Sequence, residues 1–403
     1  MERTRSSARL LWIAAFAAVA IFGMAVRILP WTSFHAIGYD EGLYRDYVRK
    51  LSAVGLGHYP EIAEQYVERQ STLPAAILPP TRFLYIFAGY VWHKITGAEP
   101  LPALHHVSTL FSILLLFAAG AFAWRLGGRG YGLAVFALMS CAPTQIHMAQ
   151  HALIDGFFAF WATLCLWSLW ENLQRPNDWR WLAVYAVSLA ITVITKENAA
   201  FAGFGLAGVL LLNRWLRFGT VTSRLLLLSV AGPLVGLLIL VWLCGGANTF
   251  VQTYRLLVSK ASVLPYAIAT GDGPWYRYLV DLLVVSPLTL LIAVGAIFRL
   301  RSADKASLVL VAFVSATYLV MCNVRYGMNL RYTNMWDMPL RYLAIVCLTD
   351  LSGSLRRSRE LALVVAVVLL CFVDLRQYHV FFVQHNLYEL VPGGLLRAIQ
   401  MLK

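Results

Sequence analysis

The sequence predicts an all-α polytopic membrane protein with about eleven transmembrane helices. Only 13% of its 403 residues are charged and 60% are hydrophobic, whereas a soluble domain carries roughly 25% charged residues. The chain also contains repeated apolar runs of about 17 to 25 residues, the length that crosses a bilayer as a helix. These runs are continuous rather than alternating, which favours helices over the strands of a barrel.

The apolar runs set the expected order of the spans. The first run contains small residues like those of a signal cleavage site, but it exceeds the roughly 7–15 apolar residues of a signal peptide. We therefore expect an uncleaved first span and one membrane domain over residues 1–403. The expected spans are residues 10–29, 103–125, 130–146, 152–171, 180–195, 198–213, 224–244, 278–299, 306–322, 336–351 and 361–377.

The basic residues predict the orientation of the chain in the membrane. If the N-terminus is cytoplasmic, every inside segment carries two or three Lys or Arg, whereas the short outside loop around His147 to His151 has none. Because short cytoplasmic loops are enriched in Lys and Arg, we expect this orientation in the inner (plasma) membrane. The net charge of +13 then reflects topology, and we expect no nucleic-acid partner.

Long outside loops separate some of the spans. In the first outer loop, residues 31–102, the stretch "EGLYRDYVRKL" places Leu43, Tyr47 and Leu51 on one helical stripe. This pattern predicts a helix lying in the membrane interface. The stretch "RFLYIFAGYVWHKITG" is too short to span and predicts a second interfacial helix. A second long outer loop covers residues 245–277.

Ionisable residues gather at the predicted outward ends of the spans. Such residues are costly at membrane depth and are functional candidates for that reason. Together they predict a cleft at the membrane surface with carboxylates on one side and cations on another. They are Asp40 and Glu41 after the first span, Asp155 in the fourth, Lys196 and Glu197 between two spans, and Arg325 and Arg331 above the tenth.

Such a cleft suits a lipid-linked phosphate, whose tail lies in the bilayer and whose headgroup lies at the interface. Arg and Lys would bind the phosphate, and a carboxylate would accept the proton of an attacking hydroxyl. Simpler roles stay open: Asp40 and Asp155 as helix caps, Lys196 and Glu197 as a local ion pair, and Arg82 as a snorkelling side chain. The arginines above the tenth span could also bind lipid headgroups.

Metal binding and disulfide formation are weakly indicated. His147 and His151 are four residues apart, which is compatible with a shared metal, but one such pair is poor evidence. The six cysteines lie in or beside apolar runs, and we expect ordinary thiols. A link among the outward Cys141, Cys244 and Cys322 stays open.

Six segments, in order, resemble the GT-C class of integral-membrane glycosyltransferases. The similarity is to bacterial lipid A aminoarabinose transferase and protein O-mannosyltransferases, which are glycosyltransferase family 39-like. It covers nearly the whole chain. The segments are "YDEGLYRDYVRKL", "LYIFAGYVWHKITGAEPLPALHHVSTLFSILLL", "HALIDGFFAFWATLCLWSL", "ITVITKENAAF", "GDGPWYRYLVDLLVVSPLTLL" and "LRYTNMWDMPLRYLA".

The resemblance implies roles for particular residues. Asp40 corresponds to the catalytic acid of the class and Asp155 to its supporting carboxylate. Lys196 and Arg331 fall near the donor phosphate. Further phosphate-binding candidates are Arg325 and Arg82, and further site candidates are Glu41, Tyr39 and Glu197. Glu197 stands where glycine is usual, which weakens the implied role of Lys196.

The resemblance also implies the reaction. The donor would be a polyprenyl-phosphate sugar, used at the periplasmic face with inversion, and the acceptor a lipid, a glycan or a protein. No cofactor is implied with certainty, and a divalent cation is left open. The rival reading is a transporter or flippase of lipid-linked sugars, although the sequence lacks the paired broken spans typical of transporters. An oligosaccharide ligase or polymerase is a second rival.

Overall fold

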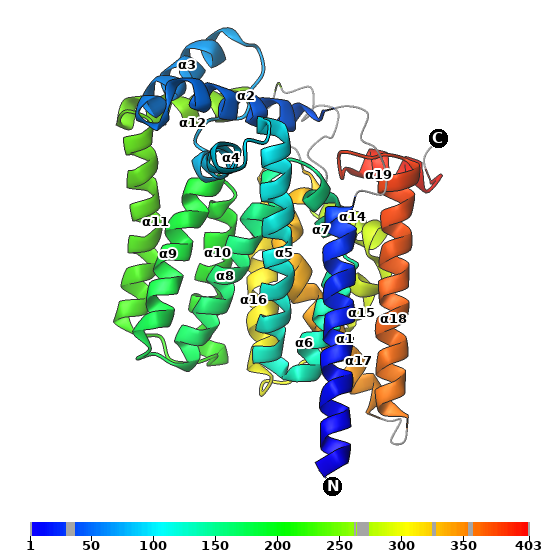
Figure 1. Ribbon diagram of the computed structural model, residues 1–403. Helices are drawn as coiled ribbons and strands as arrows, with labels where there is room; N and C mark the ends of the chain where they lie inside the picture. The colour runs from blue at the N-terminus through cyan, green and yellow to red at the C-terminus, as the bar shows by residue number, and fades with distance from the viewer. Residues whose placement is uncertain are drawn as a thin grey trace.

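The computed structural model describes residues 2–29, 37–261, 263, 274–324, 328–353 and 358–401, and these residues form helices and loops without any strand. Long helices stand side by side as a bundle, and shorter helices lie across one end of it (Figure 1). The N-terminus lies at the opposite end of the bundle from these short helices. The predicted all-α fold is confirmed.

Each predicted span coincides with one helix or with two consecutive helices. The single helices of the bundle are α1 (Glu2–Ile28), α5 (Pro100–Gly127), α8 (Ile154–Gln174), α9 (Trp179–Thr195), α10 (Ala199–Leu216), α11 (Ser223–Leu243), α16 (Lys305–Met321), α17 (Asp337–Ser352) and α18 (Arg359–Tyr378).

The number of membrane crossings is supported only in part. Among the described residues, four helices are long and apolar enough to cross a membrane, or five if one bent pair counts as a single span. They are α5, α10, α11 and the segment Arg359–Gln384, which joins α18 to the π-helix η3 (His379–Gln384). Other bundle helices, including α9 and α16, are apolar but shorter.

Two predicted spans are wrong as continuous helices, and proline is the reason in both. The run 130–146 divides into α6 (Arg129–Ser140) and α7 (Pro143–Gln150), which meet at 56°. The run 278–299 divides into α14 (Arg277–Val285) and α15 (Pro287–Ile297). Pro143 and Pro287 lack an N–H and clash with the preceding turn, so each starts a new helix rather than continuing one.

The break between α6 and α7 is held by an arginine from the first helix. Arg27 is buried, and its guanidinium donates to the backbone oxygens of Met139 and Ser140 at 2.8 and 3.3 Å. It also donates to the Ser112 hydroxyl at 2.9 Å. These bonds supply donors to carbonyls at the end of α6, where intrahelical donors run out.

The short helices at the end of the bundle belong to the predicted outer loops. Both expected helices are present, and Tyr44, Tyr47, Val48 and Leu51 form the buried face of the first. That face packs against buried residues of the second expected helix and of the helix bundle. Two further α-helices and one short 3₁₀ helix were not expected. The layer comprises α2 (Tyr39–Val54), η1 (Leu56–His58), α3 (Tyr59–Thr72), α4 (Phe83–Thr96) and α12 (Ala247–Ala261).

The C-terminal residues return to this end of the molecule. After η3, residues 385–391 form a loop that we call the C-terminal strap, and α19 (Pro392–Ala398) follows it. The Leu330 N–H donates to the Leu390 carbonyl at 3.0 Å. This bond joins the strap to the 3₁₀ helix η2 (Leu330–Trp336), which precedes α17.

Candidate functional site

Asp40 and Arg331 form the first of three ion pairs that join distant parts of the chain. Asp40 lies in the first turn of α2, and its Oδ2 is 3.2 Å from Nη2 of Arg331 in η2. The Asn329 side chain accepts a hydrogen bond from the Arg331 backbone N–H at 2.9 Å, which orders the start of η2. The structure therefore brings the first predicted acid next to a predicted phosphate-binding cation.

Asp155 and Lys196 form the second ion pair. Nζ of Lys196 donates to Oδ1 of Asp155 at 2.5 Å, and the two side chains are only 2% and 4% exposed. The same ammonium lies 4.5 Å from the ring centroid of Tyr332. Asp155 also interacts electrostatically with Arg331 and Arg82. These interactions connect the ion pairs into one cluster.

Arg82 and Glu197 form the third ion pair. The Arg82 guanidinium donates to both oxygens of Glu197, and it donates to the Tyr44 hydroxyl at 2.6 Å. Burial alone would lower the pKa of Arg82, but the Glu197 carboxylate outweighs it and raises that pKa well above the ordinary value. Arg82 is therefore not a snorkelling side chain, and Glu197 pairs with Arg82 rather than with its neighbour Lys196.

Glu41 is buried and ties three segments together. Its carboxylate accepts hydrogen bonds from the backbone N–H groups of Gly38 and Ala152, each at 2.7 Å. His105 and His151 lie 3.2 and 3.3 Å from the same carboxylate. Burial alone would raise the pKa of Glu41, but the two histidines and the Gly38 N–H hold it well below its usual range. Glu41 thus anchors the start of α2 and does not pair with a cation of the cluster.

Helix capping does not account for the two catalytic candidates. Gly38 is the N-cap residue of α2 and Leu153 that of α8, and neither Asp40 nor Asp155 makes a side-chain cap hydrogen bond. Both carboxylates do lie in the first turn of a helix, where the helix dipole favours a negative charge. Their side-chain partners are the cations described above.

Two other predicted site residues, Tyr39 and Arg325, are not part of the cluster described above. Tyr39, at the start of α2, is 64% exposed. Arg325 lies outside the described residues. The remaining predicted residues, Arg82, Lys196, Glu197 and Arg331, are all in the cluster.

The sequence prediction missed Glu389 of the C-terminal strap. Its Oε2 is 3.2 Å from the same Arg331 Nη2 that meets Asp40, and it accepts a hydrogen bond from the Asn329 amide at 2.6 Å. Burial raises the pKa of Glu389, as does the Asp40 charge, against the opposing effect of Arg331. The only signal in the sequence was a carboxylate on the outward side of the last span.

Metal binding by the two histidines gains no support from the geometry. The rings of His147 and His151 touch at a centroid distance of 4.6 Å, and Nε2 of His147 lies 3.0 Å from the Tyr388 carbonyl oxygen. Within the part of the chain that the structure describes, no three His, Cys, Asp or Glu side chains are grouped to hold a metal ion. All six cysteines are free thiols.

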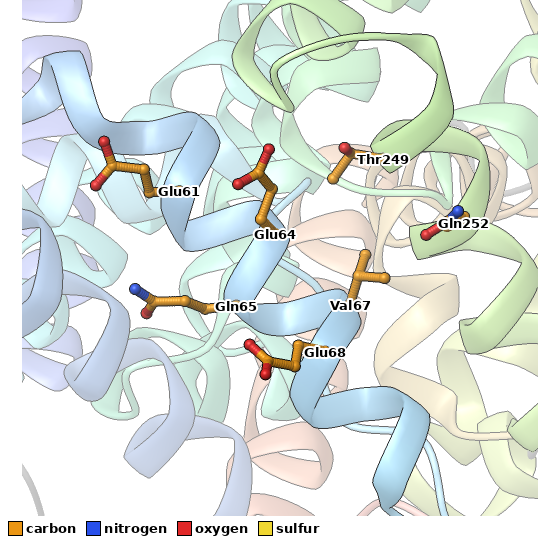
Figure 2. A pocket seen from close by; sticks show the side chains of 7 residues that line it. All are labelled: Glu61, Glu64, Gln65, Val67, Glu68, Thr249 and Gln252. Carbon is orange, nitrogen blue, oxygen red and sulfur yellow. The ribbon is translucent and has the colours of Figure 1, made fainter.

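A separate groove of about 490 Å³ lies between α3 and α12. Figure 2 shows Glu61, Glu64 and Glu68 of α3 beside Thr249 and Gln252 of α12. No residue of the ion-pair cluster lines this groove, and its charged lining residues are all acidic. It is therefore a poor place for an anionic phosphate.

Comparisons with known proteins agree with this architecture. Residues 93–251 match the family of dolichyl-phosphate-mannose-protein mannosyltransferases. The crystal structure of ArnT from Cupriavidus metallidurans, in the apo state, superposes with a TM-score of 0.55 at 16% identity. This superposition covers 98% of the present chain and 75% of ArnT. The chain has a GT-C fold.

Other structures share the GT-C fold at similarly low identity. The oligosaccharyltransferase of Archaeoglobus fulgidus, tethered to an acceptor peptide, gives a TM-score of 0.61 at 11% identity. It covers 91% of the present chain, which spans only 55% of that protein. ArnT bound to undecaprenyl phosphate gives a TM-score of 0.51 at 16% identity. No curated protein sequence matched the chain.

Proposed function

We propose that the protein transfers a sugar from a polyprenyl-phosphate donor to an acceptor hydroxyl at the outer (periplasmic) face of the inner membrane. The observation that carries this proposal is the contact between Asp40 and Arg331 at 3.2 Å. It puts a candidate proton acceptor beside a candidate phosphate ligand, at the end of the bundle that bears the short helices. The match to a mannosyltransferase family and the GT-C fold support the same assignment.

In the proposed reaction, Asp40 is the general base. Its carboxylate accepts the proton of the acceptor hydroxyl while the hydroxyl oxygen attacks the anomeric carbon of the donor sugar. The bond between that carbon and the phosphate oxygen breaks, and its electron pair leaves with the polyprenyl phosphate. Attack from the side opposite the leaving group inverts the anomeric carbon. The Asp40 side chain is 20% exposed, which leaves it accessible to an acceptor.

Three cations are available for the phosphate of the donor. Arg331 and Arg82 offer planar guanidinium groups that suit bidentate contact, and Lys196 offers a point charge. Neutralising the phosphate stabilises the charge that develops on the leaving group. In this proposal Asp155 is the supporting carboxylate, since its bond to Lys196 fixes the ammonium inside the cluster.

The lipid-linked donor fits the setting of the cluster. One crystal structure of ArnT contains undecaprenyl phosphate, and the archaeal oligosaccharyltransferase AglB has been described in complex with dolichol-phosphate and an inhibitory peptide. A donor of this kind places its phosphate at the membrane interface, where the proposed site would lie. The acceptor is a lipid, a glycan or a protein in this proposal.

Asp40→Asn tests the proposed base. We expect this variant to lose sugar transfer by at least about a hundredfold, while it folds and binds lipid phosphate. Cells lacking the chain would be complemented with wild type, Asp40→Asn or the control Asp46→Asn, and envelope lipids, glycans and proteins compared by mass spectrometry. Asp46 lies on the same helix, its side chain is 54% exposed, and it pairs with its chain neighbour Arg45. Full product formation by Asp40→Asn would reject the proposal. If wild type makes no glycosylated product but moves lipid across the membrane, and Asp40→Asn moves it equally well, a transporter would be favoured.

A further inference from the structure

Two adjacent side chains of the C-terminal strap lie against Arg331. Glu389 contacts Arg331, and the Tyr388 ring lies 5.8 Å from the same guanidinium. The Tyr388 ring also meets the His151 ring edge-on at 5.0 Å. It fills the space beside Gly38, where an added Cβ would lie only 2.1 Å from a ring carbon. The strap is thus fitted closely to the start of α2.

The charges of the cluster leave little room for an additional anion. Each of the three cations already contacts a carboxylate, and Arg331 contacts two. The cluster as described therefore holds three positive and four negative side chains: Arg82, Lys196 and Arg331 against Asp40, Asp155, Glu197 and Glu389. A donor phosphate entering this cluster would meet like charges at close range, so a carboxylate has to give way.

Glu389 is better suited to give way than the two aspartates. Its side chain is 30% exposed, compared with 4% for Asp155 and 20% for Asp40. It is carried by a loop rather than by a helix. The backbone of this loop is attached by the bonds from Leu330 to Leu390 and between His147 and Tyr388. In contrast, the proposed base Asp40 is fixed by a helix whose start Glu41 anchors. Glu197 is 29% exposed, but the Arg82 guanidinium donates to both of its oxygens and holds it in place.

From this geometry we infer that Glu389 is a displaceable counter-ion that occupies, on Arg331, the position that the donor phosphate takes. The inference rests on the proposed function and adds a gating step to it. When the phosphate binds Arg331, Glu389 leaves and residues 385–391 move away from the guanidinium. Glu389 therefore lowers the affinity for donor lipid and keeps Arg331 neutralised when no lipid is bound.

Binding measurements on the full chain in lipid nanodiscs test the inference, with undecaprenyl phosphate as the probe. Glu389→Gln removes the competing negative charge and replaces the carboxylate by an uncharged amide of nearly the same shape. We expect it to bind the probe about threefold to fivefold more tightly than wild type, the factor that one partly exposed ion pair is worth. The control Glu360→Gln removes an exposed carboxylate from the other end of α18 and should bind like wild type.

A second measurement follows the strap directly. Hydrogen–deuterium exchange of residues 385–391 should increase when undecaprenyl phosphate is added to wild type. The inference would be overturned if Glu389→Gln bound the probe no more tightly than wild type. It would also be overturned if exchange in the strap fell or stayed constant on lipid binding. Neither result would contradict the proposed sugar transfer. If folded wild type binds no polyprenyl phosphate at all, the proposed function fails and the inference falls with it.

Discussion

At the residue scale, the candidate site consists of oppositely charged side chains in contact with one another. A buried carboxylate or ammonium is expensive unless it is paired, and the bond between Lys196 and Asp155 shows how this chain meets that cost. Such pairs cannot be assigned from sequence. Lys196 and Glu197 are neighbours in the chain, yet their partners are Asp155 and Arg82.

Glu41 has a different role from Asp40, although the two are adjacent. We expect Glu41→Gln to lower the free energy of unfolding by about 2 kcal/mol, because the carboxylate accepts several hydrogen bonds while buried. The loss should appear in thermal unfolding in detergent at neutral pH. Tyr39→Phe, which changes an exposed side chain, is the control.

The stabilisation that Glu41 provides should depend on pH. The pKa of Glu41 is depressed in the folded protein, so its stabilisation is complete above the unfolded pKa of about 4.5 and is lost as the pH falls below it. The difference in stability between wild type and Glu41→Gln should therefore be largest above pH 4.5 and narrow in more acidic solution. A difference that grows on acidification below that point would contradict the assigned hydrogen bonds.

Most of the candidate residues could be identified from the sequence, but their pairing in space could not. Asp40, Asp155, Lys196 and Arg331 were found because ionisable groups at membrane depth are rare and costly. Glu389 was not found, because its contact with Arg331 depends on where the chain turns after α18. No local pattern of residues encodes that turn.

At the element scale, small residues bring neighbouring helices into close contact. Gly232 and Gly236 of α11 face the backbone of α9, so that an added Cβ would lie 2.9 Å from the Ala186 oxygen and 2.5 Å from the Ala190 oxygen. Membrane helices associate through this kind of packing because lipid supplies no hydrophobic drive between them.

Gly236→Leu should therefore force α9 and α11 apart. We expect a loss of about 2 kcal/mol or more in the free energy of unfolding, because the new side chain has no space. Thermal unfolding of the purified protein measures it. Gly203→Leu on α10 is the matched control, since its added Cβ would have no atom within 4 Å. Equal stability of the two variants would show that the α9–α11 contact is not tight.

Helix positions were predicted well, whereas helix breaks were not. Apolar composition continues through Pro143 and Pro287, so hydropathy alone gives one span where the structure has two helices. Proline marks both breaks in the sequence and could have been used. The helices α3 and α12 were missed because the long loops that contain them are not uniformly apolar.

At the scale of the whole molecule, the predicted topology concerns which end of the helix bundle faces the periplasm. The N-terminus and the short helices α2, α3, α4 and α12 lie at opposite ends of the bundle (Figure 1). With the N-terminus in the cytoplasm, as the positive-inside rule predicts, those short helices face the periplasm. This orientation is a prediction that labelling can test.

Single cysteines in a cysteine-free background test the orientation. Glu64→Cys on α3 should react with a membrane-impermeant maleimide added to intact spheroplasts, because α3 is expected outside. Ala303→Cys, in the turn before α16, should react only after the membrane is permeabilised. The reverse pattern would place Asp40 in the cytoplasm and remove the basis of the proposed function.

The contact between Asp40 and Arg331 also bears on how the protein is made. The two residues are 291 positions apart, and the strap that contacts Arg331 comes later still. A ribosome must therefore add 291 residues after Asp40 before the two charges can meet. Nascent or prematurely terminated chains lack a complete cluster, so under the proposed function we expect them not to react with the lipid-linked donor.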